Sequence, residues 1–236
     1  METLQGALTF AFVLISTILG IIIVIKYFTF RKRELLLVGI TWILIVSPYW
    51  PDAINFILIL VYGTLLDIKI YFFLANALIP IIHITWMIAF TDLLYKQKQK
   101  TILLIFTAEA ILFEIFFIYF LIIDPSLIGT QIAPFYVEWT DFIVFYLLFS
   151  ILIFLITGIL FAQRSLKSDK KELRLKGKFL MIAFITFATG TFIDAIGSLT
   201  EITLVLARTF VISGAFMFYI GFTLPTFIKE LFLKED

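Results

Sequence analysis

Long apolar segments separated by short polar connections occupy the whole chain. Seven of them exceed the roughly 20 residues that a helix needs to cross a bilayer, and they span about residues 4–28, 35–62, 70–95, 101–123, 138–163, 179–199 and 201–228. This pattern predicts an all-α, polytopic membrane protein in which residues 1–236 form a single domain of seven transmembrane helices. Because the spans and their short connections use the full length, we expect no soluble catalytic or sensor domain.

Prolines interrupt three of these segments. Pro48 and Pro51 fall inside the second segment, Pro80 inside the third and Pro225 near the end of the seventh. Proline has no backbone N–H and clashes with the preceding turn, so each position predicts a kink or a short unwound stretch. Broken backbone at membrane depth is tolerated only where protein or a polar cavity satisfies it. We therefore expect these four prolines to act as hinges beside a cavity.

The connections alternate in charge. Sixteen of the 18 Lys and Arg residues fall in four places, namely residues 26–33, 96–100, 164–178 and 229–234. The intervening connections carry Asp67, Asp124, Glu138 and Glu201, with Lys69 as their one cation. Because basic connections are retained in the cytoplasm, the alternation predicts an extracytoplasmic N-terminus and a cytoplasmic C-terminus.

Composition excludes several classes of protein. A chain that is 62% hydrophobic, with a mean hydropathy of +1.12, is not a soluble domain with a polar surface. The charge asymmetry concerns orientation and lipid headgroups, so the lipid bilayer is the expected partner and nucleic acid is not. The absence of Cys excludes disulfides, thiol catalysis and thiolate metal sites.

Candidate catalytic and cofactor residues are scarce. His83 is the only histidine and cannot form a zinc site alone, although Glu114 or Asn76 could supply further oxygen ligands; we expect no metal. No Ser lies in a nucleophile-elbow or Ser-x-x-Lys context, so we expect no enzyme. A retinal protein of the usual kind needs a Lys inside the seventh segment, where only Lys229 occurs, at the cytoplasmic end. Arg208 cannot form that linkage, so no cofactor is expected.

Charged residues inside the apolar segments are the main candidates for a functional site. Asp194 and Arg208 fall at comparable depths in two consecutive antiparallel segments, which predicts an ion pair between them. The pair is either a structural clasp or a counter-ion pair in a ligand site. Asp194 also belongs to a stripe of small and polar residues that share one helical face, Ala183, Thr186, Gly190, Asp194 and Gly197.

The other acids leave alternatives open. Glu109 and Glu114 in the fourth segment mark either a proton or cation route or protonated acids hydrogen-bonded to a neighbouring Thr or Tyr. Asp52 and Asp141 fall close to the outer interface, where solvation is cheap. They require no special role, although both could line the mouth of a cavity.

Two stretches resemble known families. The run from Tyr71 to Asn76, followed by Ile79-Pro80, Trp86 and Phe90-Thr-Asp92, is similar to the third span of the seven-transmembrane sensory module of prokaryotic histidine kinases. No kinase domain follows Asp236, so the resemblance implies a stand-alone sensing module that signals through a partner.

The end of the seventh segment, around Pro225, also resembles in outline the corresponding region of G-protein-coupled receptors. There a Pro lies about one turn from the inner face and an amphipathic tail follows. The Asn before that Pro and the Tyr after it are missing here. The likeness therefore extends to the general plan only.

These observations favour a non-enzymatic seven-helix sensor or receptor-like protein of a prokaryotic plasma membrane, with an outward-facing pocket for an unknown small molecule or lipid. The expected ligand-binding residues are Asp194, Arg208, Asn76, Trp50, Glu114, Trp86 and His83. Residues 164–178 form either a surface for a cytoplasmic partner or a topogenic, lipid-binding loop. The alternatives are a small proton- or cation-coupled transporter and a structural or accessory membrane subunit.

Overall fold

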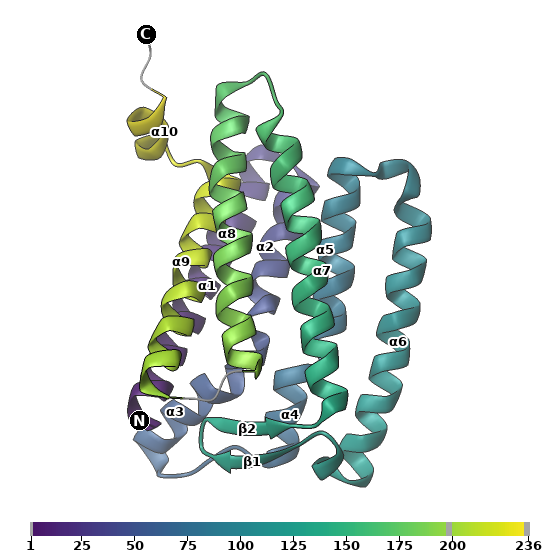
Figure 1. Ribbon diagram of the computed structural model, residues 1–236, viewed down its shortest axis with the longest axis vertical. Helices are drawn as coiled ribbons and strands as arrows, with labels where there is room; N and C mark the ends of the chain where they lie inside the picture. Colours follow the sequence, from purple (N-terminus) through teal and green to yellow (C-terminus); the bar gives the residue numbers. More distant parts are fainter. Residues whose placement is uncertain (1, 197–199, 234–236) are drawn as a thin grey trace.

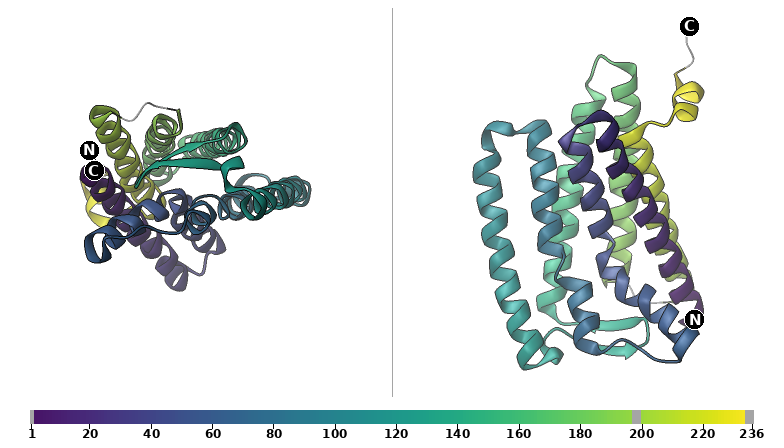
Figure 2. Two further views of the ribbon diagram at one scale, coloured as in Figure 1. Left: turned by 90° about the horizontal axis from the view of Figure 1, so that it is seen from below. Right: turned by 180° about the vertical axis from the view of Figure 1, so that it is seen from behind.

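A computed structural model describes residues 2–196 and 200–233 as one bundle of antiparallel helices (Figures 1 and 2). Seven helical segments are long and apolar enough to cross a membrane: Glu2–Phe30, Arg33–Tyr62, Ile68–Leu94, Lys96–Ile123, Asp141–Leu166, Lys171–Ala195 and Glu201–Thr223. The predicted all-α class and the seven candidate spans are confirmed. The direction in which the bundle crosses the membrane stays a prediction.

Proline divides the second and third spans, as the sequence predicts. The elements of the first three spans are α1 (Glu2–Phe30), α2 (Arg33–Ile45), the 3₁₀ turn η1 (Ser47–Tyr49), α3 (Trp50–Tyr62), α4 (Ile68–Asn76) and α5 (Ile79–Leu94). Pro48 lies in η1, Pro51 in the first turn of α3 and Pro80 in the first turn of α5. Each of these prolines stands at the start of a helix, where its missing N–H has no helical partner to lose.

The remaining elements include a small sheet. They are η2 (Lys96–Lys98), α6 (Gln99–Ile123), η3 (Pro125–Leu127), β1 (Gly129–Ala133), β2 (Tyr136–Trp139), α7 (Asp141–Leu166), α8 (Lys171–Ile196), α9 (Glu201–Thr223) and α10 (Thr226–Phe232). Pro225 separates α9 from α10, and Leu224 before it has a φ of 42°. The breaks at all four predicted hinge prolines are therefore present.

Two sequence-based boundaries were wrong. Glu138 belongs to β2, so the fifth span begins at Asp141 and not at 138; the outer connection folds into an antiparallel hairpin in which Gly129 pairs with Trp139 and Ala133 with Tyr136. The sixth span begins at Lys171 and not at 179, which leaves only residues 167–170 between α7 and α8. Lys, Glu, Leu and Arg are good helix formers, so the helix continues beyond its apolar part.

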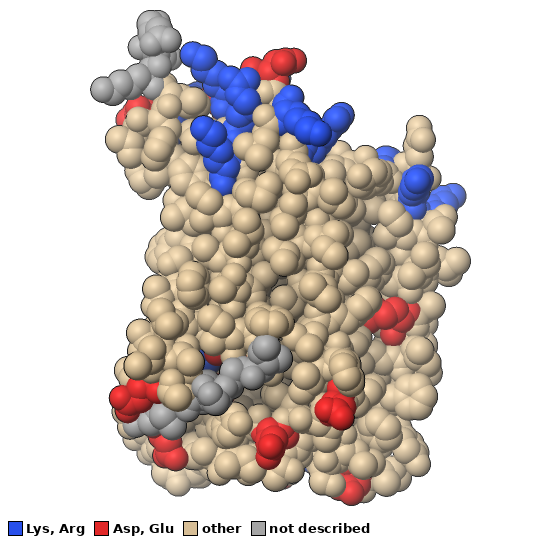
Figure 3. Space-filling model, viewed as in Figure 1, with Lys and Arg blue, Asp and Glu red and all other residues tan. Residues whose placement is uncertain are grey.

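The two ends of the bundle differ in charge (Figure 3). Lys and Arg gather at the end that carries residues 31–33, 96–100 and 164–178, which we call the basic end. Acidic side chains are visible at the opposite end, which carries the β1–β2 hairpin and which we call the hairpin end. The observed segregation agrees with the charge pattern of the connections.

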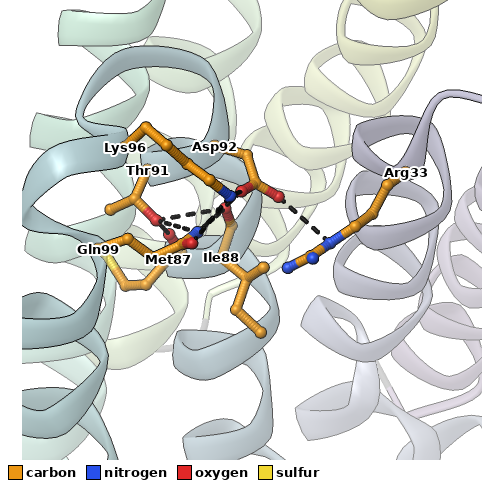
Figure 4. A network of polar contacts seen from close by, with 7 residues as sticks. All are labelled: Arg33, Met87, Ile88, Thr91, Asp92, Lys96 and Gln99. Atoms are coloured by element: carbon orange, nitrogen blue, oxygen red, sulfur yellow. Dashed lines mark hydrogen bonds and ion pairs between the residues drawn. The ribbon is translucent and has the colours of Figure 1, made fainter.

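A polar network ties three spans together at the basic end (Figure 4). Asp92, at the end of α5, forms ion pairs with Arg33 of α2 and with Lys96 of η2. Gln99 of α6 donates hydrogen bonds to Asp92 and to the hydroxyl of Thr91, each over 2.9 Å. Asp92 therefore anchors the basic ends of α2, α5 and α6 to one another.

Small residues allow the spans to approach closely. A Cβ at Gly190 of α8 would lie 2.8 Å from the carbonyl oxygen of Ala207 in α9, and one at Gly214 would lie 3.0 Å from the backbone nitrogen of Phe187. The predicted stripe on α8 thus faces α9 at Gly190, and Ala183 is also buried. Gly197, the last member of that stripe, lies outside the described residues.

An aromatic cluster fills the middle of the bundle. The indole of Trp42 stacks on Phe218 with ring centroids 3.8 Å apart, and Phe154, Phe184 and Phe187 pack around the pair. All five side chains are buried. We call this set the aromatic block, and it separates the hairpin end from the basic end.

The peripheral position of α6 suits contact with lipid (Figure 2). Only 17% of its apolar window is buried, the lowest share among the described spans. Leu104, Ile105, Leu112 and Ile122 each expose more than half of their surface. Such a surface is expected to face the bilayer.

Close contact between α1 and α2 yields a test of the fold. A Cβ at Gly39 would lie 2.8 Å from the backbone nitrogen of Val24 and 3.0 Å from the carbonyl oxygen of Gly20. Gly39→Ala is therefore expected to force α1 and α2 apart and to lower the free energy of unfolding by about 1–3 kcal/mol. Thermal unfolding of the detergent-purified protein measures the change.

Ala108→Val is the control, because it adds two methyl groups at an exposed position of α6 and should leave the midpoint unchanged. Equal midpoints for Gly39→Ala and the wild type would contradict the close α1–α2 approach.

Candidate ligand-binding site

A cavity of about 320 Å³ lies inside the hairpin end of the bundle. Helices α1, α3, α4, α5, α7, α8 and α9 and the hairpin all contribute to its wall. On α5, α7 and α8 its deepest lining residues are Trp86, Phe154 and Phe187, near the middle of each span. Phe154 and Phe187 belong to the aromatic block, so that block forms the floor of the cavity.

The Asp194–Arg208 ion pair lies in the cavity wall, and its formation is confirmed. A guanidinium N–H of Arg208 donates to Oδ2 of Asp194, and only 3% of the surface of Arg208 is exposed. Arg208 Nε donates to Oγ1 of Thr9 in α1 over 3.1 Å. These contacts compensate a guanidinium that would otherwise be strongly destabilised at this depth.

Tyr49 completes the environment of the ion pair. Its hydroxyl donates to Oδ2 of Asp194 over 2.8 Å, and the Cζ of Arg208 lies 4.9 Å from the centroid of its ring. Tyr49 can reach both groups because the break at Pro48 and Pro51 ends α2 beside them. Oδ1 of Asp194 is buried and has no hydrogen-bond partner among the described residues.

Asp52 is a second acid of the cavity, so the alternative that it lines a cavity is confirmed, whereas the interpretation of it as a solvated interfacial residue was wrong. It is 7% exposed and accepts a hydrogen bond from the hydroxyl of Tyr71 in α4. Asp52 lies in the first turn of α3, directly after the proline break, and the new direction of the helix turns its side chain into the bundle. Asp141, by contrast, is exposed.

The hairpin lies across one end of the bundle (Figure 2) and contributes to the wall of the cavity. Its residues 135–139 all belong to the lining. Two side chains hold the turn between the strands: Gln5 of α1 donates to the carbonyl oxygen of Phe135 over 2.6 Å, and Asn55 of α3 donates to that of Pro134 over 2.9 Å. The hairpin is therefore fixed to α1 and α3 through its backbone.

A second polar cluster adjoins the cavity at His83. The Nδ1 of His83 lies 3.2 Å from Oε2 of Glu109 in α6, and its Nε2 lies 2.9 Å from the hydroxyl of Ser150 in α7. The partner of His83 is thus Glu109, and neither Glu114 nor Asn76 is bonded to it. Oε1 of Glu109 and the hydroxyl of Tyr146 are buried without a hydrogen-bond partner in the described part of the chain.

The structure brings together five of the seven residues expected at a ligand site. Asp194, Arg208, Asn76, Trp86 and His83 line the cavity, as does Pro48. Trp50 instead packs against the larger buried hydrophobic cluster that contains the aromatic block, and Glu114 lies on α6 outside the lining. Pro51, Pro80 and Pro225 also lie outside the lining.

Sequence reasoning missed several lining residues, among them Gln5, Tyr49 and Tyr71. One signal was present: Tyr49 and Asp52 belong to the Ser-Pro-Tyr-Trp-Pro-Asp run that already marked a polar break inside an apolar segment. Gln5 and Tyr71 carried no comparable signal. Within the described ranges, no group of three or more His, Asp or Glu residues is arranged to hold a metal ion.

Comparisons with known protein families and with characterised proteins found no match to this sequence.

The buried ion pair gives a test by a double-mutant cycle. Arg208→Gln leaves a buried carboxylate unpaired, and Asp194→Asn leaves a buried guanidinium unpaired. Each is expected to lower the free energy of unfolding by about 3–5 kcal/mol. The double variant should be more stable than the sum of the two losses predicts, by at least about 1 kcal/mol. Thermal unfolding in detergent measures all three variants.

Glu172→Gln is the matched control. Glu172 pairs with Lys229 over 2.5 Å, but both side chains are about half exposed, so its loss should change stability by less than about 1 kcal/mol. Strictly additive effects of Arg208→Gln and Asp194→Asn would show that the two side chains do not interact.

Proposed function

We propose that the protein is a non-enzymatic, receptor-like sensor of a prokaryotic plasma membrane that binds a small molecule in the cavity at its hairpin end. The observation that carries this proposal is the one-sided position of the cavity. Its polar lining extends from the hairpin to the middle of the spans, and the aromatic block lies beneath it. Pockets of this size, with apolar walls and a few convergent polar groups, are typical of small-molecule sites.

The charge distribution supports an orientation in which this cavity opens to the outside. Basic connections lie at the opposite end, so the positive-inside rule places the N-terminus and the hairpin outside and the C-terminus in the cytoplasm. The basic ends of α7 and α8, within residues 164–178, then form the cytoplasmic surface offered to a partner or to anionic lipid.

The proline break at Pro48 can transmit a conformational change from the ligand to the cytoplasmic end of the bundle. Pro48 lines the cavity, and α2, which ends just before it, carries Arg33 at its other end. Arg33 pairs with Asp92, the residue that joins α2, α5 and α6. A ligand that shifts the break at Pro48 therefore acts on one end of a helix whose other end belongs to a cytoplasmic polar network.

A transporter is the second candidate, and the His83–Glu109–Ser150 cluster favours it. A carrier requires polar groups at successive depths, and this cluster adjoins the cavity from the side of α6. A purely structural subunit is the third alternative, in which the buried charges only hold the helices together.

Orientation can be tested directly because the chain contains no Cys. Thr130→Cys introduces a thiol in β1 at the hairpin end, and Gln97→Cys introduces one in η2 at the basic end; both positions are exposed. In intact cells a membrane-impermeant maleimide should label Thr130→Cys, whereas Gln97→Cys should be labelled only after permeabilisation. The reverse pattern would place the cavity on the cytoplasmic side and overturn an outward-facing receptor.

Ligand binding is tested by thermal unfolding of the detergent-purified chain against a library of metabolites and lipids. A bound compound should raise the midpoint of the wild type. It should not raise that of Ala75→Leu, because Ala75 is a buried lining residue and a larger side chain there reduces the cavity. A library in which no compound stabilises the wild type would support the structural subunit instead.

The stabilising compound then distinguishes the sensor from the carrier in proteoliposomes. The sensor predicts no flux of that compound and no loss of binding in Glu109→Gln. Flux that Glu109→Gln abolishes would establish the carrier.

A further inference from the structure

The wall of the cavity carries more acidic than basic side chains. Asp52, Asp194 and Glu138 are its acids, and among the described residues Arg208 is its only Lys or Arg. His83 also lines the cavity, but its two ring nitrogens lie beside Glu109 and Ser150. Arg208 is committed to Asp194, with which it forms the buried ion pair. One buried carboxylate, that of Asp52, therefore forms no ion pair with a Lys or Arg among the described residues.

The surroundings of Asp52 confirm this imbalance. The one hydrogen bond that its side chain accepts from the described residues comes from a neutral group, the hydroxyl of Tyr71. No Lys or Arg among the described residues forms an ion pair with it. A neutral donor stabilises a buried carboxylate less than a cation does, so the site favours an additional positive charge.

A second acceptor at the same cavity is also unoccupied. Oδ1 of Asp194 is buried and receives no hydrogen bond from the described residues, because Arg208 and Tyr49 both donate to Oδ2. Asp52 and Asp194 come from different spans, and both residues line the same cavity.

The remaining wall is rich in aromatic rings. Tyr49, Tyr71 and Trp86 line the cavity together with Phe154 and Phe187. The faces of such rings attract cations, and Arg208 already lies over the ring of Tyr49 in this way. Acidic oxygens combined with aromatic walls are the features that recognise organic ammonium groups.

We propose that the cavity binds a small organic cation, a primary amine or a quaternary ammonium with an apolar body, whose nitrogen lies beside Asp52 and whose body lies against the aromatic wall. The assignment rests on the proposed ligand-binding function and adds the chemical class of the ligand. A volume of about 320 Å³ equals that of roughly ten water molecules in the liquid, which suits a body of about ten heavy atoms.

Four probes of similar shape test the class of ligand: 2-phenylethylamine, its trimethylammonium derivative, 3-phenyl-1-propanol and 3-phenylpropionate. Isothermal titration calorimetry on the detergent-purified wild type measures each affinity. We expect at least one of the two cations to bind at least tenfold more tightly than the alcohol, and the carboxylate to be the weakest. Equal or tighter binding of the alcohol or the carboxylate would overturn the cation assignment while leaving a ligand-binding cavity intact.

Asp52→Asn isolates the contribution of the charge, because the amide oxygen can still accept from Tyr71. It should weaken cation binding at least tenfold and leave alcohol binding unchanged. Asp141→Asn is the matched control, since Asp141 is an exposed acid at the same end of the bundle and lies outside the lining. Unchanged cation affinity in Asp52→Asn would exclude Asp52 as the counter-charge.

Tyr71→Phe gives an independent result if Asp52→Asn does not fold. It removes the hydrogen bond from Tyr71 to Asp52 and keeps the carboxylate. The affinity for the cations should therefore increase, whereas the affinity for the alcohol should not change. Weaker cation binding in Tyr71→Phe would contradict the assignment. A wild type that binds none of the four probes, but is stabilised by a compound of the library, would overturn the cation class alone. If none of the four probes binds and no compound of the library stabilises the wild type, the proposed ligand-binding function is overturned as well.

Discussion

The guanidinium of Arg208 imposes the strongest constraint on this fold. A permanent charge at such depth is tolerated only when an acid and further acceptors surround it. Here the acid comes from α8, a hydroxyl from Thr9 of α1, and an aromatic face from Tyr49. The consecutive helices α8 and α9 must therefore meet two segments that are distant in the sequence, α1 and η1, at one point, which fixes the register between α8 and α9 and the position of α1.

The same constraint explains why the second span is broken. A continuous helix through residues 47–52 would carry Tyr49 and Asp52 at positions set by helical periodicity alone. The break at Pro48 and Pro51 instead lets η1 reach the ion pair and lets α3 leave in a new direction. Such a break is tolerated at membrane depth only where protein or a polar cavity surrounds the irregular backbone. The cavity and the irregular backbone thus depend on each other.

Much of this arrangement follows from the sequence, and the reasons for the remainder are physical. Apolar length predicts the spans, proline predicts their breaks, and antiparallel neighbours of equal depth predict the Asp194–Arg208 pair. The inward position of Asp52 could not be predicted, because no local pattern fixes the direction that a chain takes after a break. Likewise, Glu109 meets His83 because of how α5 and α6 pack, and that contact is set by tertiary structure.

The hairpin could not be predicted from the sequence for a related reason. Its strands of five and four residues alternate only briefly, and their pairing is a contact between segments that hydropathy alone does not specify. The early start of α8 has a different cause: helix propensity persists where hydropathy falls, so the end of an apolar run does not mark the end of a helix.

The attachment of the hairpin has a consequence for how such a protein diverges. Gln5 and Asn55 hold residues 134 and 135 through carbonyl oxygens, which every amino acid possesses. The hairpin is therefore anchored independently of the side chains that it presents to the cavity. Mutations of Phe135 or Val137 can alter the shape of the cavity while the hairpin stays in place. Backbone atoms attach the hairpin, whereas its side chains shape the cavity, so ligand preference can change during evolution without loss of the fold.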